Sequence, residues 1–110
     1  MNEITIAVNV DNDKPTVSGQ ELHEALMIDT PYKKWFDRMV GYGFTEGTDF
    51  WTFLSQSTGG RPPVDHQLTI DMAKELCMIQ RTEIGKRCRE YFLNLERQWN
   101  SPDAVMVRAL

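Results

Sequence analysis

The chain has 110 residues, of which 41% are hydrophobic and 25% are charged, as is typical of one domain with its own hydrophobic core. Its formal net charge of −4 argues against nonspecific coating of nucleic acid, because such binding depends on neutralising phosphates with lysine and arginine. Residues 1–30 hold one base and six acids, whereas residues 31–97 hold ten bases and nine acids. A local basic face is therefore compatible with the acidic total.

The N-terminal residues lack the features of a signal peptide, and no stretch stays apolar over the roughly 18 residues that a membrane-spanning helix needs. Cys77 and Cys88 both fall in apolar helical patterns, which favours buried reduced thiols over a disulfide. We therefore expect a cytoplasmic protein that does not contact membranes.

The first predicted element is a β-strand over residues 4–10, where large apolar residues occupy every second position. Residues 11–15 have the composition of a turn, with aspartate, asparagine and proline. The following residues, Thr16 and Val17, are predicted to return as a short partner strand.

Two capped helices follow with almost no linker between them. Ser18 and Glu21 form a capping-box pattern for a first helix that buries Leu22, Ala25 and Leu26. Residues 27–29 are the predicted turn. Thr30 is then the predicted N-cap of a second helix, with Pro31 in its first turn. This pairing predicts a unit similar to a helix-turn-helix.

The second helix, over residues 31–40, is amphipathic. One face holds Tyr32, Trp35, Phe36, Met39 and Val40, and Lys33, Lys34 and Arg38 lie off that face.

A β-hairpin is predicted after the helix pair. Residues 50–54 are aromatic and favour a strand, and residues 64–68 form the returning strand. The Gly-Gly-Arg-Pro-Pro sequence between them places Arg61 near the hairpin end. A hairpin beside a helix pair resembles the wing of a winged helix.

Two further helices complete the predicted domain. Thr69 caps one and Thr82 caps the longest one, which reaches Trp99. Gly85 inside that helix indicates close approach of another element. We expect one domain over residues 1–100, and residues 101–110 to begin a linker or helix that leads to a downstream domain.

These elements together predict an α+β fold. It has a small antiparallel sheet with a β-hairpin wing and about four helices, and it is similar to a winged helix-turn-helix.

Several segments resemble the AntA/AntB phage antirepressor N-terminal domain. The most specific are residues 60–79 (GRPPVDHQLTIDMAKELCMI) and residues 81–92 (RTEIGKRCREYF). Residues 17–23 (VSGQELH), the Trp35-Phe36 pair and residues 42–44 (YGF) match in the same order. The resemblance implies a temperate-phage or prophage protein, acting in the bacterial cytoplasm, that relieves repression by the lysogeny repressor.

Six residues are candidates for contact with DNA or with a protein partner: Tyr32, Lys33, Lys34, Arg38, Arg61 and Arg87. Basic side chains on an exposed helix and at a hairpin end suit phosphate contact, although a charged stripe is also what any surface helix shows.

The sequence offers little support for catalysis or for a bound cofactor. Residues 58–61 lack the Gly-Lys-Ser/Thr ending of a phosphate-binding loop. No two of His23, His66, Cys77 and Cys88 have zinc-ligand spacing, and no nucleophile motif accompanies either histidine. We expect neither an enzyme nor a metal or cofactor site.

Two mechanisms stay open. In the first, the acidic region of residues 11–29 complements a basic repressor protein. In the second, the basic second helix and the wing contact operator DNA. Self-association into a homo-oligomer is also left open.

Overall fold

The computed structural model describes residues 6–11, 14–55, 59–60 and 63–101. In chain order the elements are two strands, two helices, two strands and two helices. Their bounds are β1 Val8–Asp11, β2 Lys14–Ser18, α1 Gly19–Ala25, α2 Tyr32–Val40, β3 Phe50–Leu54, β4 Val64–Thr69, α3 Ile70–Ile79 and α4 Glu83–Trp99. The predicted α+β fold is confirmed.

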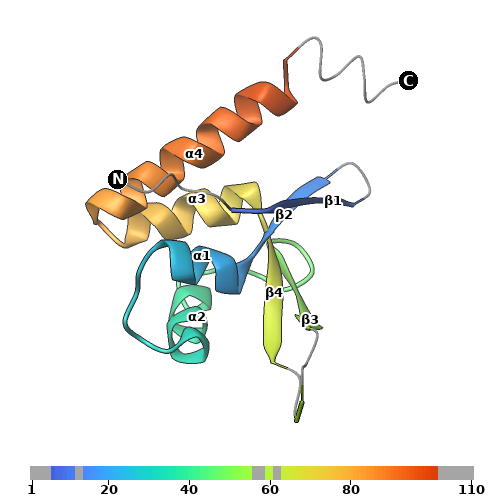
Figure 1. Ribbon diagram of the computed structural model, residues 1–110, viewed down its shortest axis with the longest axis vertical. Helices are drawn as coiled ribbons and strands as arrows, with labels where there is room; N and C mark the ends of the chain where they lie inside the picture. The colour runs from blue at the N-terminus through green and yellow to red at the C-terminus, as the bar shows by residue number, and fades with distance from the viewer. Residues whose placement is uncertain (1–5, 12–13, 56–58, 61–62, 102–110) are drawn as a thin grey trace.

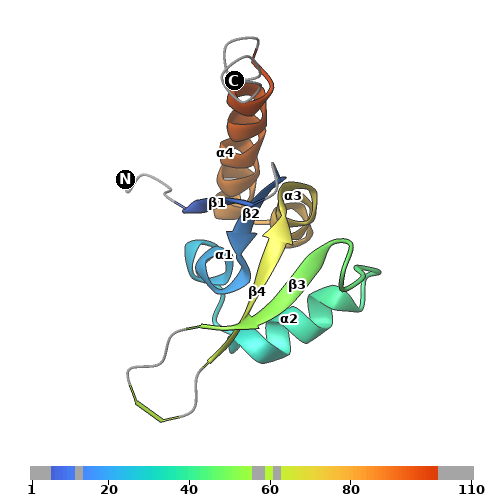
Figure 2. The ribbon, with the colours of Figure 1, turned by 90° about the vertical axis from the view of Figure 1, so that its right-hand side faces the viewer.

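The four strands form one antiparallel sheet in the order β1-β2-β4-β3. Because α1 and α2 lie between β2 and β3 in the sequence, the chain leaves the sheet at Ser18 and returns on its outer edge at Phe50. Figure 1 shows the helices on one side of the sheet, and Figure 2 shows β3 and β4 in front of α2. The predicted β-hairpin is confirmed as β3 and β4, paired from Phe50 with Leu68 to Leu54 with Val64.

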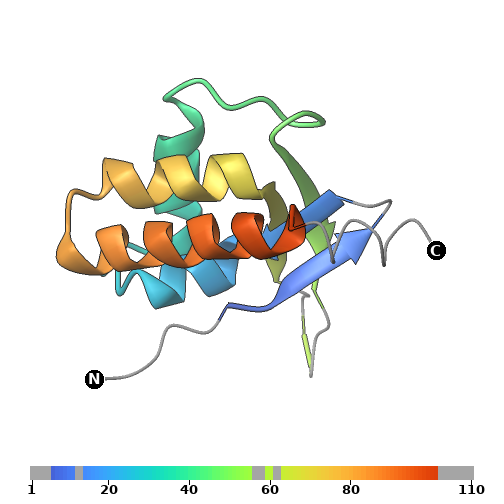
Figure 3. The same cartoon turned by 90° about the horizontal axis from the view of Figure 1, so that it is seen from above.

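The hydrophobic core lies where the sheet meets the four helices. Trp35 of α2 and Phe92 of α4 are among its largest fully buried side chains, and Val17 and Leu68 are their buried counterparts on the sheet. Helices α3 and α4 lie side by side, as Figure 3 shows from above. The core therefore joins the helix pair to the two C-terminal helices through the central strands.

Close packing of α3 against α4 depends on Gly85. A Cβ atom at this position would lie 2.5 Å from the carbonyl oxygen of Cys77. The predicted close approach at Gly85 is confirmed. Cys77 and Cys88 are buried free thiols, as the sequence indicated.

Three of the four predicted N-caps are confirmed. The Ser18, Thr69 and Thr82 hydroxyl oxygens accept hydrogen bonds from Glu21 N, Met72 N and Gly85 N. Serine and threonine at these positions satisfy amide groups that have no partner inside the helix.

The predicted cap at Thr30 is wrong. The N-cap of α2 is Pro31, which has extended backbone angles and makes no side-chain capping bond. The helix begins one residue later than expected, at Tyr32, because extended geometry at Pro31 keeps Thr30 outside it. The carbonyl oxygen of Thr30 instead lies 2.6 Å from Nε2 of His23.

The strand at the N-terminus differs in its bounds from the prediction. Regular pairing begins at Val8 and extends to Asp11, and Ile6 is buried ahead of it. The carbonyl oxygen of Ile6 accepts a hydrogen bond from the Tyr91 hydroxyl of α4, so this segment binds to a helix before the strand starts. Ile4 lies outside the described residues.

Candidate functional site

Helices α1 and α2 meet strand β4 around the side chain of Tyr32. Tyr32 is the first residue of α2, and its hydroxyl lies 2.6 Å from Nδ1 of His66 on β4. A Cβ atom at Gly19, the first residue of α1, would collide with this hydroxyl. Glycine at position 19 therefore lets the tyrosine ring lie against the start of α1.

Aromatic side chains surround this hydrogen bond. The His66 ring stacks on Phe36 with a centroid distance of 3.8 Å, and Phe50 meets both rings edge-on. His23 of α1 lies against Tyr32 and Trp35. The cluster fixes α2 on the sheet by stacking and burial.

Burial favours the neutral forms of the two bonded groups. It raises the pKa of Tyr32 far above its usual value of 10.0, and the negative charge of Asp65 raises it further. Burial lowers the pKa of His66 from its usual 6.5, although the nearby carboxylates of Asp65, Glu46 and Asp37 act in the opposite direction. A histidine and a tyrosine that stay neutral fit a structural hydrogen bond better than proton transfer.

Asp65 holds the N-terminus of α1 on β4. Its carboxylate accepts hydrogen bonds from the Ser18 hydroxyl at 2.5 Å, the Gln20 amide at 3.0 Å and the His66 amide at 2.7 Å. The Gln20 side chain also donates to the Val64 carbonyl oxygen at 2.5 Å. These bonds fix where the helix pair sits relative to the hairpin.

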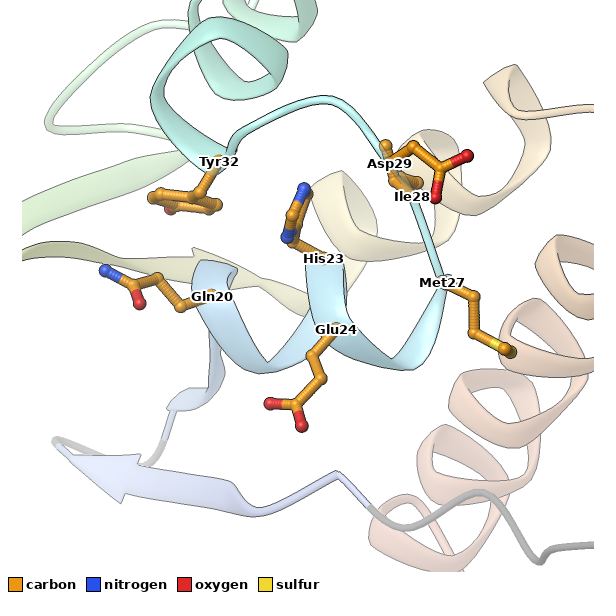
Figure 4. A pocket seen from close by; sticks show the side chains of 7 residues that line it. All are labelled: Gln20, His23, Glu24, Met27, Ile28, Asp29 and Tyr32. Carbon is orange, nitrogen blue, oxygen red and sulfur yellow. The ribbon is translucent and has the colours of Figure 1, made fainter.

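Two surface hollows lie on either side of Tyr32. The first, of about 510 Å³, is drawn in Figure 4 and lies between α1 and the turn that follows it. It is lined by Gln20, His23, Glu24, Met27, Ile28, Asp29 and Tyr32. The second, of about 490 Å³, lies between α2 and the start of β4. It is lined by Gln20, Tyr32, Lys33, Phe36, Asp37, Pro63, Val64 and His66.

The first hollow, which we call the acidic hollow, combines negative charge with an exposed apolar side chain. Glu24 and Asp29 are exposed, and Figure 4 shows their carboxylates on different parts of the rim. Met27 is 76% exposed and has a left-handed backbone conformation, with φ of 55°. This conformation is uncommon for a residue other than glycine.

Four of the six candidate residues from the sequence lie together on α2. Lys33, Lys34 and Arg38 are exposed, as the periodicity predicted, and Tyr32 is partly buried. Lys33 lines the second hollow and forms an exposed ion pair with Asp37 at 3.4 Å.

The fifth candidate, Arg87, lies on another helix. Arg87 belongs to α4, which packs on α3 and lies at the opposite end of the helices from α2 in Figure 1. Arg61 lies outside the described residues.

The sequence missed Met27 and His66 as parts of the site. The sequence predicts only a turn at Met27, and it predicts an acidic region over residues 11–29 without a definite geometry. His66 contacts Tyr32, which is 34 positions away in the chain, and no local pattern reveals such a contact. The excess of acidic residues before residue 30 was the one feature of the sequence that pointed to this site.

Other kinds of site find no support in the described part of the chain. No group of three or more histidine, cysteine, aspartate or glutamate residues there is placed to hold a metal ion. None of the helices described is both long and apolar enough to cross a bilayer.

Comparison with protein-family models gave a match to the AntA/AntB antirepressor family over residues 17–82. Comparison with curated proteins and with solved structures gave no match. The matched region runs from β2 to just beyond α3 and includes every residue that lines the two hollows. Since it spans more than half of the chain, the protein belongs to the AntA/AntB antirepressor family.

Proposed function

We propose that this protein is a phage or prophage antirepressor module that relieves lysogeny repression by binding the repressor protein directly. The acidic hollow is the observation that carries this proposal. It presents exposed carboxylates of Glu24 and Asp29 around an exposed methionine side chain.

A repressor binds operator DNA through a surface rich in lysine and arginine, since phosphate contacts supply much of the affinity. Carboxylates on the antirepressor complement such a surface and speed the encounter. Met27 adds an adaptable apolar contact, because the thioether side chain is flexible and polarisable. Occupation of the basic surface then removes the repressor from its operator.

The first experiment is capture of the repressor from phage-induced lysate on the immobilised 110-residue chain, with nuclease treatment as the control. Retention of the repressor after nuclease supports direct protein contact. Recovery that disappears with the nucleic acid contradicts it.

Charge reversal then locates the surface. The double variant Glu24→Lys/Asp29→Lys is expected to lose at least about ten-fold in affinity for the purified repressor, which corresponds to about 1.4 kcal/mol. The matched control is Glu75→Lys/Glu90→Lys, which makes the same change in net charge at exposed positions of α3 and α4. Equal loss in both double variants would show a general charge effect and contradict a site at the acidic hollow.

The second candidate function is contact with operator DNA by α2. It is favoured by the exposed side chains of Lys33, Lys34 and Arg38 and by the lack of any acid in the first turn of this helix. The positive end of the helix dipole adds to the attraction for phosphate. Asp37 reduces this effect, because it pairs with Lys33.

Paired substitutions separate the two functions. Lys33→Ala/Lys34→Ala is expected to weaken DNA binding and to lower its dependence on salt if α2 contacts phosphates. The control Lys86→Ala/Arg97→Ala removes the same charge from exposed positions of α4. Undiminished DNA binding by the α2 variant would rule out this helix as the DNA-contacting element.

A further inference from the structure

Strand β3 forms the outer edge of the sheet, next to β4. The Thr69 amide donates to the Asp49 carbonyl at 2.9 Å, and the Ser55 amide donates to the Pro63 carbonyl at 2.9 Å. Because hydrogen-bonding direction alternates along an antiparallel strand, Trp51 and Phe53 also bond toward β4. The backbone groups of Phe50, Thr52 and Leu54 therefore point outward.

The first part of this outer edge is covered. The Gly47 amide donates to the outward Phe50 carbonyl at 2.8 Å. Within the described ranges, no strand or turn pairs with the outward backbone groups of Thr52 and Leu54. These two residues form an open window of backbone donors and acceptors.

The open window lacks the usual protection of an edge strand. Natural edge strands carry lysine, proline or inward-pointing charges that prevent pairing with another chain. Residues 50–54 contain no charged residue and no proline. One carboxylate lies beside the window, because that of Glu46 accepts a hydrogen bond from the Thr52 hydroxyl at 2.6 Å.

The side chains of β3 also leave apolar surface uncovered. Phe50 faces α2, because its ring meets Phe36, and so Trp51 and Phe53 point to the opposite face of the sheet. Figure 2 shows no described helix in front of β3 on that face. Trp51 is 38% exposed, and Leu54 is 66% exposed at the end of the strand.

We propose that β3 pairs in antiparallel fashion with β3 of a second copy of this chain. In the register that uses the open window, Thr52 of each copy lies opposite Leu54 of the other. Phe53 of one copy then lies opposite Phe53 of the other. This is a non-hydrogen-bonded pair, in which cross-strand side chains are closest. The alternative register, which places Phe50 opposite Leu54, is blocked because Gly47 already uses the Phe50 carbonyl.

The chemistry of the strand identifies the second copy as the occupant. An uncharged strand does not repel its own copy, whereas the rest of this acidic chain does. In a dimer with two-fold symmetry, the outward backbone groups of Thr52 in each copy bond to those of Leu54 in the other copy. All of these donors and acceptors therefore find a partner within the window. The contact is small, and we expect a weak dimer with less than about 1,200 Å² of buried surface. It shares no residue with the acidic hollow.

The test is sedimentation velocity of the 110-residue chain over a wide range of concentration. The wild type is expected to shift from monomer to dimer, and Leu54→Lys is expected to weaken dimerisation at least about ten-fold. Thr52→Pro removes one outward amide, leaves every bond to β4 and is expected to have the same effect. Met78→Lys is the matched control, since Met78 is 57% exposed on α3 and should leave the dimer unchanged.

A cross-link tests the register. Phe53→Cys is expected to give a disulfide-linked dimer under mild oxidation by oxidised glutathione, and Thr52→Cys is not, because Thr52 does not face itself. Circular dichroism confirms that each variant is folded. A wild type that stays monomeric, a dimer unaffected by Leu54→Lys and Thr52→Pro, or a cross-link at Thr52→Cys in place of Phe53→Cys overturns the proposal.

Discussion

Tyr32 at the start of α2 and His66 in the middle of β4 share a hydrogen bond of 2.6 Å, and Phe36 stacks on the same histidine. This contact fixes the helix pair on the sheet and separates the two hollows. The shape of the candidate site therefore depends on one partly buried polar pair within an aromatic cluster.

Removal of the Tyr32 hydroxyl tests this dependence. Tyr32→Phe keeps the ring but leaves Nδ1 of His66 without its partner, and we expect a loss of about 1 kcal/mol in the free energy of unfolding. Urea denaturation measures the loss. Tyr42→Phe is the control, because Tyr42 is 63% exposed, and its stability should equal that of the wild type. Equal stabilities of all three proteins would show that the hydrogen bond contributes nothing.

His66 is expected to make stability depend on pH. Burial lowers its pKa in the folded state below the value of about 6.5 for the unfolded chain, so the unfolded chain binds the proton more readily. The free energy of unfolding is then highest above about pH 6.5 and falls as pH drops toward the lowered pKa. Below that pKa this contribution stays constant.

Denaturant titrations from neutral to mildly acidic pH measure this effect. The His66→Gln variant is expected to lose part of the slope, since the titrating group is gone. An unchanged slope in the variant would assign the pH dependence to other groups.

Asp65 is expected to be the most sensitive polar residue of the fold. It is 7% exposed and accepts three hydrogen bonds, of which the two from the Ser18 hydroxyl and the Gln20 amide join the start of α1 to β4. Asp65→Ala leaves those donors without partners, and we expect a loss of about 3 kcal/mol or more. The control Asp71→Ala removes a side chain that is 86% exposed, and thermal unfolding should show a much smaller effect. Comparable losses in the two variants would contradict this role of Asp65.

Gly85 tests whether packing overrides helix propensity. Alanine favours a helix by about 1 kcal/mol over glycine, but its Cβ atom would meet the Cys77 carbonyl oxygen. Since that atom belongs to the backbone of α3, the two helices must separate, and we expect Gly85→Ala to lose about 1–3 kcal/mol. Asn94→Ala, at an exposed position of α4, should be neutral or slightly stabilising. A more stable Gly85→Ala protein would show that α3 and α4 move apart easily.

Local patterns in the sequence predicted most of the fold. The caps at Ser18, Thr69 and Thr82 depend on a side chain and an amide three positions apart, so the sequence alone specifies them. The hairpin and the buried face of α2 likewise follow from periods of two and about 3.6 residues. Where the prediction failed, at Thr30, extended geometry at the following proline moved the helix start by one residue.

The candidate site was decided by the tertiary structure. Ser18 and Asp65 are 47 positions apart, and Tyr32 and His66 are 34 apart, so no local period links them. The sequence determined which residues are charged, apolar or capping, because those properties belong to single side chains and their near neighbours. Only the folded chain decided that His66 lies against Tyr32 and that, within the described residues, the outward backbone groups of Thr52 and Leu54 stay unpaired, because each depends on how distant elements pack together.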